Sequence, residues 1–234
     1  MCGRFVQASS PALLVERFAV DEVVGAETFE AHYNLAPRMD ALTIVEGDDV
    51  RRLGPMRWGL VPSWAESPAV GDRLINARAE TLVEKPAFKP AFERRRCIIP
   101  ADGFYEWQAA PGPRKQPMYI HARDGSPLAF AGLWESWRDR TDPEAPWIRT
   151  CVVITTDANA MMRPVHDRMP AMLATADWDQ WLDREFTDGG ALLHVLCPAP
   201  DDLLAMHPVS TRVNGARNDD ASLILREDPL TLFP

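Results

Sequence analysis

The stretch CIIPADGFYEWQ, residues 97–108, opens the part of the sequence that decides the fold. Three stretches of the same kind follow it: PMYIHA (117–122), LAFAGLWESW (128–137) and WIRTCVVITT (147–156). All four are rich in apolar, β-branched and aromatic residues, which favour strands, and turn-forming segments separate them. This succession predicts a mostly antiparallel sheet.

The flanking sequence adds further strands and short helices. We expect strands at 2–8, 41–47, 50–61 and 169–174, and helices at 9–20, 79–95, 175–183 and 189–196. The acidic turn GDD joins the second and third of these strands. A serine before Pro11 is suited to cap the first helix, whereas Pro86 and Pro90 are expected to break the second into two pieces.

The prolines and glycines, 21 and 13 in number, are spread along the whole chain and indicate many tight connections. The segment at 108–117 (QAAPGPRKQP) suits a surface hairpin loop better than an interdomain linker. We therefore predict an α+β fold: one domain over 2–225 with a curved, mostly antiparallel sheet or irregular β-barrel and short flanking helices. Residues 226–234 are expected to form a C-terminal tail.

Composition excludes several classes of protein. No run of about 18 apolar residues exists to span a membrane, and no export signal is visible, so a cytoplasmic protein is expected. The net charge of −9 argues against coating nucleic acid by bulk electrostatics. However, 22 of the 25 cationic residues are arginine, which reflects either coding-DNA composition or local phosphate recognition.

The four cysteines, Cys2, Cys97, Cys151 and Cys197, lie far apart and form no C-x-x-C pair. Neither a disulfide framework nor a metal cluster is therefore expected, and no cofactor is predicted. Cys97 and Cys151 lie in apolar runs, where a buried, inert thiol is the simpler expectation.

Cys2 differs because it directly follows the initiator methionine in MCGRF. If Met1 is removed, the α-amino group and the thiol of Cys2 form a 1,2-aminothiol. Their ordinary pKa values lie near 8 and 8.5, so both groups would be partly nucleophilic at neutral pH. The amine can attack an aldehyde and the thiol can then close a five-membered thiazolidine ring; alternatively, the amine can act as base for the thiol in attack on an amide.

Three other stretches carry groups suited to chemistry. Asn76 and Arg78 would share a face of a strand and could fix a carbonyl or phosphate, or Asn76 could simply bond a local turn. Glu106 lies among aromatic residues, where burial raises a carboxyl pKa for proton transfer, or else it faces outward. His166, in a proline-stiffened polar loop, is either a proton carrier or a structural histidine.

These stretches, taken together and in this order, resemble the SRAP family, the SOS response-associated peptidase-like proteins. The matching segments are MCGRF, RWGLVPSW, INARAET, RCIIPADGFYEW, AFAGLWESW, ITTDAN, HDRMP and VNGARNDD. The resemblance runs from residue 2 to about residue 220, and we find no departure from the family's pattern at the key positions.

The resemblance implies that the protein shields abasic sites in single-stranded DNA. Cys2 would form a covalent thiazolidine crosslink with the ring-opened aldehyde of the site. By the same resemblance, Glu106 would act as acid and base on the sugar, His166 would move protons at the Schiff-base stage, and Asn76 would position the cysteine or the sugar. The implied protein is a monomer without membrane or cofactor, associated with the nucleoid when it is bound to DNA.

The family pattern also implies a set of DNA-binding residues: Arg4, Trp64, Arg78, Trp107 and Arg168. Arg78 and Arg168 would contact phosphates and fix the register of the strand, and aromatic side chains could stack on bases. Gly3 would leave room for the DNA beside the nucleophile.

Other functions remain open on the residues alone. Cys2 and His166 could form the nucleophile and base of a cysteine peptidase, whose action could be limited to removal of its own leader. An N-terminal-nucleophile glutamine amidotransferase also begins Met-Cys-Gly, but this sequence lacks the HRG segment that such enzymes carry. A non-catalytic nucleic-acid-binding module would use the arginines and aromatic residues but would give Cys2 and Glu106 no role.

Overall fold

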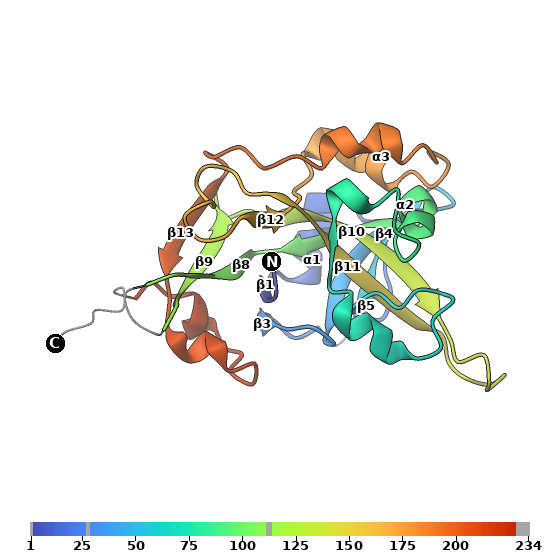
Figure 1. Ribbon diagram of the computed structural model, residues 1–234, viewed down its shortest axis with the longest axis horizontal. Coiled ribbons are helices and arrows are strands. Elements are labelled where there is room, and N and C mark those ends of the chain that lie inside the picture. Colours follow the sequence, from blue (N-terminus) through green and yellow to red (C-terminus); the bar gives the residue numbers. More distant parts are fainter. Residues whose placement is uncertain (1, 27–28, 111–113, 228–234) are drawn as a thin grey trace.

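The computed structural model describes residues 2–26, 29–110 and 114–227, and its strands form two sheets (Figure 1). The smaller sheet has five antiparallel strands in the order β13-β9-β8-β1-β3. Their bounds are β13 Leu204–Pro208, β9 Gln116–Ala122, β8 Gly103–Gln108, β1 Phe5–Gln7 and β3 His32–Leu35. The N-terminal strand is therefore an inner strand, paired with β8 on one side and β3 on the other.

The larger sheet has eight strands and closes on itself. Seven follow the order β12-β11-β10-β7-β4-β5-β2, and the eighth, β6, pairs with β11. Their bounds are β12 Arg168–Pro170, β11 Ile148–Asp157, β10 Leu128–Trp137, β7 Arg96–Ala101, β4 Asp40–Gly47, β5 Val50–Trp58, β2 Glu22–Val23 and β6 Asn76–Arg78. A parallel pairing between β5 and β11 joins the two flanks of this sheet, so the irregular barrel in the predicted α+β class is confirmed.

The two sheets enclose an apolar cluster that surrounds the N-terminal strand. Phe5 lies edge-on to Trp58 and to Phe130, with ring centroids 4.9 and 6.1 Å apart, and Phe104 packs on the same Phe130 ring. All four side chains are fully buried. Packing of this kind fixes β1, and with it the residues just before it, relative to both sheets.

The three α-helices of the described chain cover the other face of the barrel and enclose a second apolar cluster (Figure 1). The α-helices are α1 Pro11–Phe18, α2 Lys89–Arg94 and α3 Trp178–Leu182. The 3-10 helices are η1 Pro68–Arg73, η2 Ala79–Thr81, η3 Thr175–Asp177, η4 Gly190–Val195, η5 Thr211–Asn214 and η6 Ala221–Ile224. Most are too short to be stable alone, so their stability comes from packing on the sheet.

Arg96 holds two of these helices to the barrel. Its guanidinium donates to carbonyls at the C-terminal ends of α2 (Phe92 and Glu93) and α3 (Trp181), with further bonds to the carbonyls of Asp183 and Phe186. Helix C-termini lack internal partners for their last carbonyls, and this one side chain supplies them. Burial lowers the pKa of Arg96 to about 10, which leaves the group charged at neutral pH.

Most of the elements expected from the sequence are present. The helix at α1 begins at Pro11 with Ser10 as its cap, and the GDD turn joins β4 to β5 through Asp48 and Asp49, both with positive φ. The role expected of Pro90 is wrong: it occupies the first turn of α2, where a missing N–H costs nothing, and so helps to begin the helix.

Three short strands were not anticipated, namely β2, β3 and β13. Part of the expected surface loop at 108–117, residues 111–113, lies outside the described residues, as does most of the expected tail, from 228 onward.

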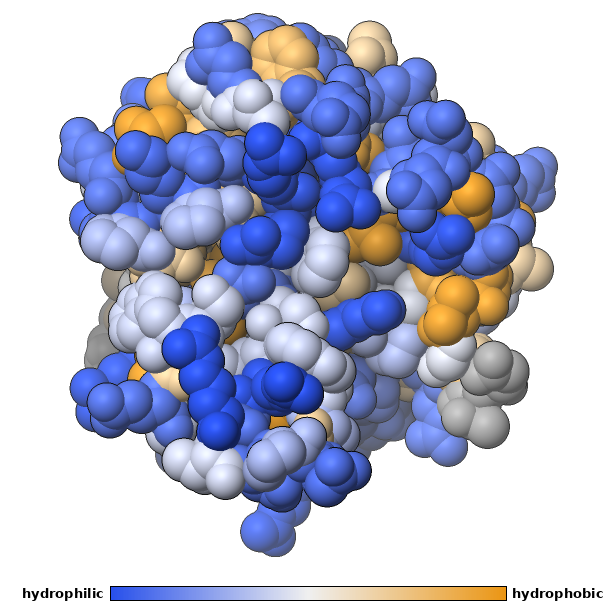
Figure 2. All heavy atoms as spheres, turned by 90° about the vertical axis from the view of Figure 1, so that its right-hand side faces the viewer, coloured by the Kyte–Doolittle hydropathy of each residue, from blue (hydrophilic) through white to orange (hydrophobic). Residues whose placement is uncertain are grey.

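The face that carries α2 and the segment after β10 is mainly hydrophilic, with apolar side chains in separate patches (Figure 2). Within the described ranges, no helix is long and apolar enough to cross a membrane.

Candidate active site and nucleic-acid interface

Cys2 lies immediately before β1 and is completely buried. Its Sγ is 3.8 Å from the carbonyl oxygen of Arg4, and its side chain belongs to the apolar cluster between the sheets. Burial raises the pKa of the Cys2 thiol, and the nearby Glu106 carboxylate raises it further. Burial thus opposes ionisation of this thiol in the chain that still carries Met1, and the partial ionisation expected after removal of Met1 stays a prediction.

Asn76 contacts the backbone of Cys2 directly. It lies on β6, opposite Val153 of β11, and its Nδ2 donates to the carbonyl oxygen of Cys2 over 2.8 Å. The partner is 74 residues away, so Asn76 does not act as a local turn former. Its Oδ1 is buried and has no hydrogen-bond partner among the described residues, which leaves one acceptor available beside the nucleophile.

Glu106 points inward, contrary to the alternative of an outward-facing side chain. It is only 4% exposed. β1 and β8 pair at Phe5 and Phe104, and the same antiparallel register continued by two residues places Glu106 opposite Gly3. The carboxylate is thus next to the N-terminal segment, in agreement with its electrostatic effect on Cys2.

His166 lies in the loop that leads into β12 and is partly exposed. Its Nδ1 is 2.9 Å from the backbone nitrogen of Arg168 and 2.7 Å from Oδ1 of Asp167. An unprotonated Nδ1 accepts the backbone N–H, whereas a protonated one donates to the carboxylate. Nδ1 is therefore engaged by its own loop in either state.

The larger sheet places this loop near Asn76. Strand β11 pairs with β6 at Val153 and with β12 at Asp157, so both neighbours flank one end of the same strand. The structure therefore brings Cys2, Asn76 and Glu106 together where the two sheets meet. His166 lies in the loop between β11 and β12, on the same side of the larger sheet's end as β6.

The two arginines expected to contact phosphate have different surroundings. Arg78 is exposed at the end of β6. Arg168 is 9% exposed, and its guanidinium is paired with Glu80 and Asp157 and also donates to the carbonyl of Thr155. A phosphate that binds Arg168 would have to compete with two carboxylates.

We predict that Glu80→Gln makes the protein less stable at neutral pH and changes its acid sensitivity. Arg168 holds the pKa of the Glu80 carboxyl below its ordinary value of 4.5, so the pair stabilises the fold above that pH and loses its effect as the pH falls through the lowered pKa. Because Glu80 is half-exposed, the expected loss at pH 7 is about 0.5–1 kcal/mol.

Urea unfolding at pH 7 and pH 3 measures this effect. The difference between the parent and the variant should be larger at pH 7 than at pH 3, whereas Glu84→Gln, which removes a nearby exposed carboxylate, should match the parent at both. A difference of the same size at both pH values would mean that the ion pair is not its source.

Arg4 and Trp107 both contact the loop of residues 211–219. Nη1 of Arg4 donates to Oδ1 of Asn34 and to the carbonyl of Val213, over 2.9 and 3.0 Å. The indole Nε1 of Trp107 donates to Oδ1 of Asn214 over 2.7 Å. Arg4 is thus engaged in holding this loop, which the sequence did not indicate.

Trp64 lies apart from these residues, in the connection between β5 and η1. It is 56% exposed, so a large apolar face is available for contact. The segment around it is fixed to the end of β10, because the indole of Trp137 donates to the carbonyl of Ala65 over 2.7 Å.

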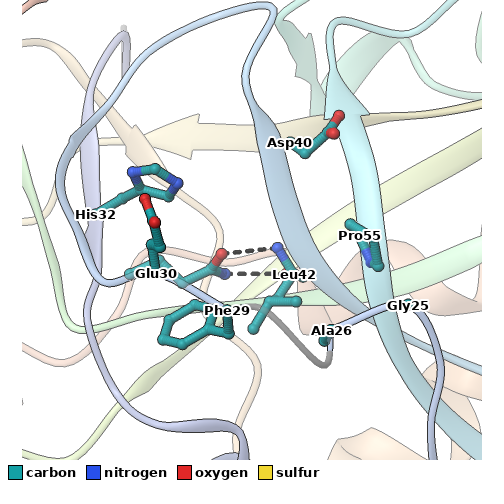
Figure 3. A pocket seen from close by; sticks show the side chains of 9 residues that line it. Gly25, Ala26, Phe29, Glu30, His32, Asp40, Leu42 and Pro55 are labelled. Carbon is teal, nitrogen blue, oxygen red and sulfur yellow. Dashed lines mark hydrogen bonds between the residues drawn. The ribbon is translucent and has the colours of Figure 1, made fainter.

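A pocket of about 380 Å³ opens elsewhere, between β3, β4 and the segment before β3 (Figure 3). Glu30 and His32 lie on one wall, and Asp40 lies on the other. His32 is paired with Asp219, and Gln7 bonds the backbone of Leu42. The two carboxylates repel a phosphate backbone, so this pocket is unsuited to nucleic acid.

No group of residues suited to a metal ion is found in the part of the chain that the structure describes.

Comparison with known proteins identifies the family. Residues 1–216 match the model of the SOS response associated peptidase (SRAP) family. The chain belongs to the SRAP family. Among SRAP relatives, the abasic site processing protein YoqW of Bacillus subtilis is 41% identical, over 96% of this chain and 99% of its own. YedK of Escherichia coli, also named an abasic site processing protein, is 32% identical over 96% of this chain and 99% of its own.

The fold is shared as well. A solved structure of a Bacteroides thetaiotaomicron protein superposes with a TM-score of 0.85 at 22% identity, covering 97% of this chain and all of the other. Sequence reasoning identified the SRAP motifs but missed Asn34 and Asn214, which organise the loop of residues 211–219. Their partners are distant in the sequence, and only the VNGARNDD motif pointed to the loop itself.

Proposed function

We propose that this protein, after removal of Met1, traps abasic sites in single-stranded DNA as a covalent crosslink through Cys2. The observation that carries the proposal is the surroundings of Cys2: a backbone fixed by Asn76, a thiol whose pKa is raised by burial, and the buried carboxylate of Glu106 beside it. The relatives YoqW and YedK, both named abasic site processing proteins, support the same substrate.

Because burial raises the pKa of the thiol, the site favours a reaction that the amine begins. The α-amino nitrogen of Cys2 attacks the aldehyde carbon of the opened sugar, and loss of one water gives a Schiff base. The sulfur then attacks the same carbon while its proton passes to a base, and a five-membered thiazolidine results. Overall, one C–N and one C–S bond form, the C=O bond is replaced, and one water leaves.

The neighbouring groups suit the proton transfers of this sequence. Glu106 would protonate the ring oxygen of the closed sugar to open it, and its carboxylate would accept the proton of the thiol. His166 would exchange protons while water leaves the Schiff-base intermediate. The buried Oδ1 of Asn76 would accept a hydrogen bond from the amine or from a sugar hydroxyl.

The DNA would be bound by a small number of contacts. Arg78 and Trp64 are exposed, and Arg168 would bind phosphate by exchanging its carboxylate partners. Because a covalent bond holds the strand, a chain of net charge −9 needs no broad basic surface. We propose a monomer that acts in the cytoplasm and joins the nucleoid on damaged DNA.

A denaturing gel tests the proposal. Processed protein is incubated with single-stranded DNA that carries one abasic site, with undamaged DNA, and with the Cys2→Ala variant as control. A shifted band that resists denaturation should require both the abasic site and Cys2. If processed protein gives no such band, the proposed function is wrong.

The family's description as a peptidase favours a second candidate, hydrolysis with Cys2 as nucleophile and His166 as base. The burial that raises the pKa of Cys2 opposes it, because a thiol nucleophile must ionise. Incubation with unrelated peptides discriminates between the two. Repeated turnover would indicate a peptidase, whereas the crosslinking account expects none.

A further inference from the structure

A pocket of about 310 Å³ lies between the end of β8 and η5, and its lining combines an aromatic ring with two cations. Its lining residues are Trp107, Arg114, Lys115, Thr211 and Asn214. We propose that this pocket is a subsite for one nucleotide of the DNA strand next to the abasic site, whose base stacks on Trp107 and whose phosphate contacts Arg114 and Lys115. The proposal rests on the proposed function and assigns it a further binding site.

The chemistry of the lining fits a nucleotide. An indole face accepts any base by stacking, and cationic side chains neutralise a phosphate. The side-chain amide of Asn214 and the hydroxyl of Thr211 add hydrogen-bonding groups at the wall formed by η5. Arg114 and Lys115 are both exposed, so their charged ends can reach a ligand at the mouth of the pocket.

The wall formed by residues 211–219 is held in place without a ligand. Asn34 is completely buried, and its Nδ2 donates to the carbonyls of Val213, Gly215 and Asn218 at 3.2, 3.2 and 2.8 Å. Its Oδ1 accepts from Arg4, which also donates to Val213. A subsite built on a fixed backbone loses little entropy when it binds.

Trp107 is fixed in the same way by its bond to Asn214. This bond uses the edge of the indole, so the ring is held at a set angle to η5. The acidic residues at and just after the end of this loop are occupied: Asp219 bonds His32 and the backbone of Tyr33 and Asn34, and Asp220 pairs with Arg212. The positive charge of the mouth is therefore not neutralised by this loop.

The pocket adjoins the strand that carries Glu106. Trp107 directly follows Glu106 on β8, and consecutive Cα atoms are about 3.8 Å apart. The two side chains point to opposite faces of the strand. An abasic residue held at Cys2 and Glu106 would thus have its neighbour pass around the end of β8 to Trp107.

The salt dependence of DNA binding tests this assignment without requiring the crosslink. In a Cys2→Ala background, the affinity for undamaged single-stranded oligothymidylate is measured between low and moderate salt. Removal of two phosphate contacts by Arg114→Ala with Lys115→Ala should flatten the slope of log affinity against log salt by about 1.4, since each contact on a single strand contributes about 0.7.

A matched control removes the same charge elsewhere. Lys85→Ala with Lys89→Ala deletes two exposed cations near α2, and it should leave the slope as in the parent. Trp107→Ala should weaken binding roughly tenfold with an unchanged slope, because stacking involves no counterion. Equal slopes for the two double variants would overturn the proposal.

The outcome is distinguishable from failure of the proposed function. If parent protein with Cys2 crosslinks abasic DNA while the Arg114/Lys115 variant keeps the parent slope, the subsite is wrong and the function stands. If the slope flattens but no crosslink forms, the nucleotide subsite stands and the covalent chemistry does not.

Discussion

Replacement of Glu106 by glutamine should slow crosslink formation by about 10²-fold or more, the usual contribution of a positioned acid or base. Glutamine keeps the size and the hydrogen-bonding shape of the side chain but can neither open the sugar nor accept the proton of the Cys2 thiol. The rate of crosslinking to abasic DNA under single-turnover conditions, followed on denaturing gels, measures the effect.

Glu135→Gln is the matched control. Glu135 is a buried carboxylate on β10 that bonds Arg95, outside the proposed site, so its replacement carries a similar structural cost. The control should crosslink at nearly the parent rate. Equal slowing of both variants would show that Glu106 acts only through the fold, and an unchanged rate for Glu106→Gln would remove it from the chemistry.

Arg96→Met should produce the largest loss of stability, about 3–5 kcal/mol. Methionine fills part of the space but leaves buried carbonyls at the ends of α2 and α3 without donors. For a chain of this size, such a loss corresponds to a fall of roughly 10 °C in melting temperature. Urea and thermal unfolding measure both quantities.

Arg96→Lys separates charge from geometry. Lysine keeps the cation but has a compact ammonium group that cannot reach carbonyls on two helices at once, so an intermediate loss is expected. Stability equal to the parent in the methionine variant would contradict the role assigned to Arg96. Crosslinking by this variant at low temperature should persist, because Arg96 lies away from Cys2.

Local signals in the sequence were sufficient for much of the fold. The GDD turn and the capped, proline-initiated start of α1 are each specified by neighbouring residues, and both are present. Pro90 was misjudged because a proline breaks a helix when it lies in the interior but is tolerated in the first turn. The sequence alone did not show that α2 begins at Lys89, which places Pro90 in that first turn. The short strands β3 and β13 exist through pairing with distant strands rather than through their own pattern.

The site was predictable as a set of residues but not as an arrangement. Nothing local connects Asn76 with the backbone of Cys2, or Arg168 with Glu80, 88 residues away. The complete burial of Cys2 was not predictable for the same reason, since it depends on aromatic residues from β1, β5, β8 and β10. Tertiary packing, which a single sequence does not show, decides each of these.

The mass of the protein–DNA adduct tests the central claim most directly. Processed protein is allowed to react with a short single-stranded oligonucleotide that carries one abasic site, and the intact adduct and its peptides are then weighed. The account predicts the summed masses of protein without Met1 and DNA less one water, with the DNA on the peptide that begins at Cys2. An adduct on another residue, or no adduct from processed protein, would contradict it.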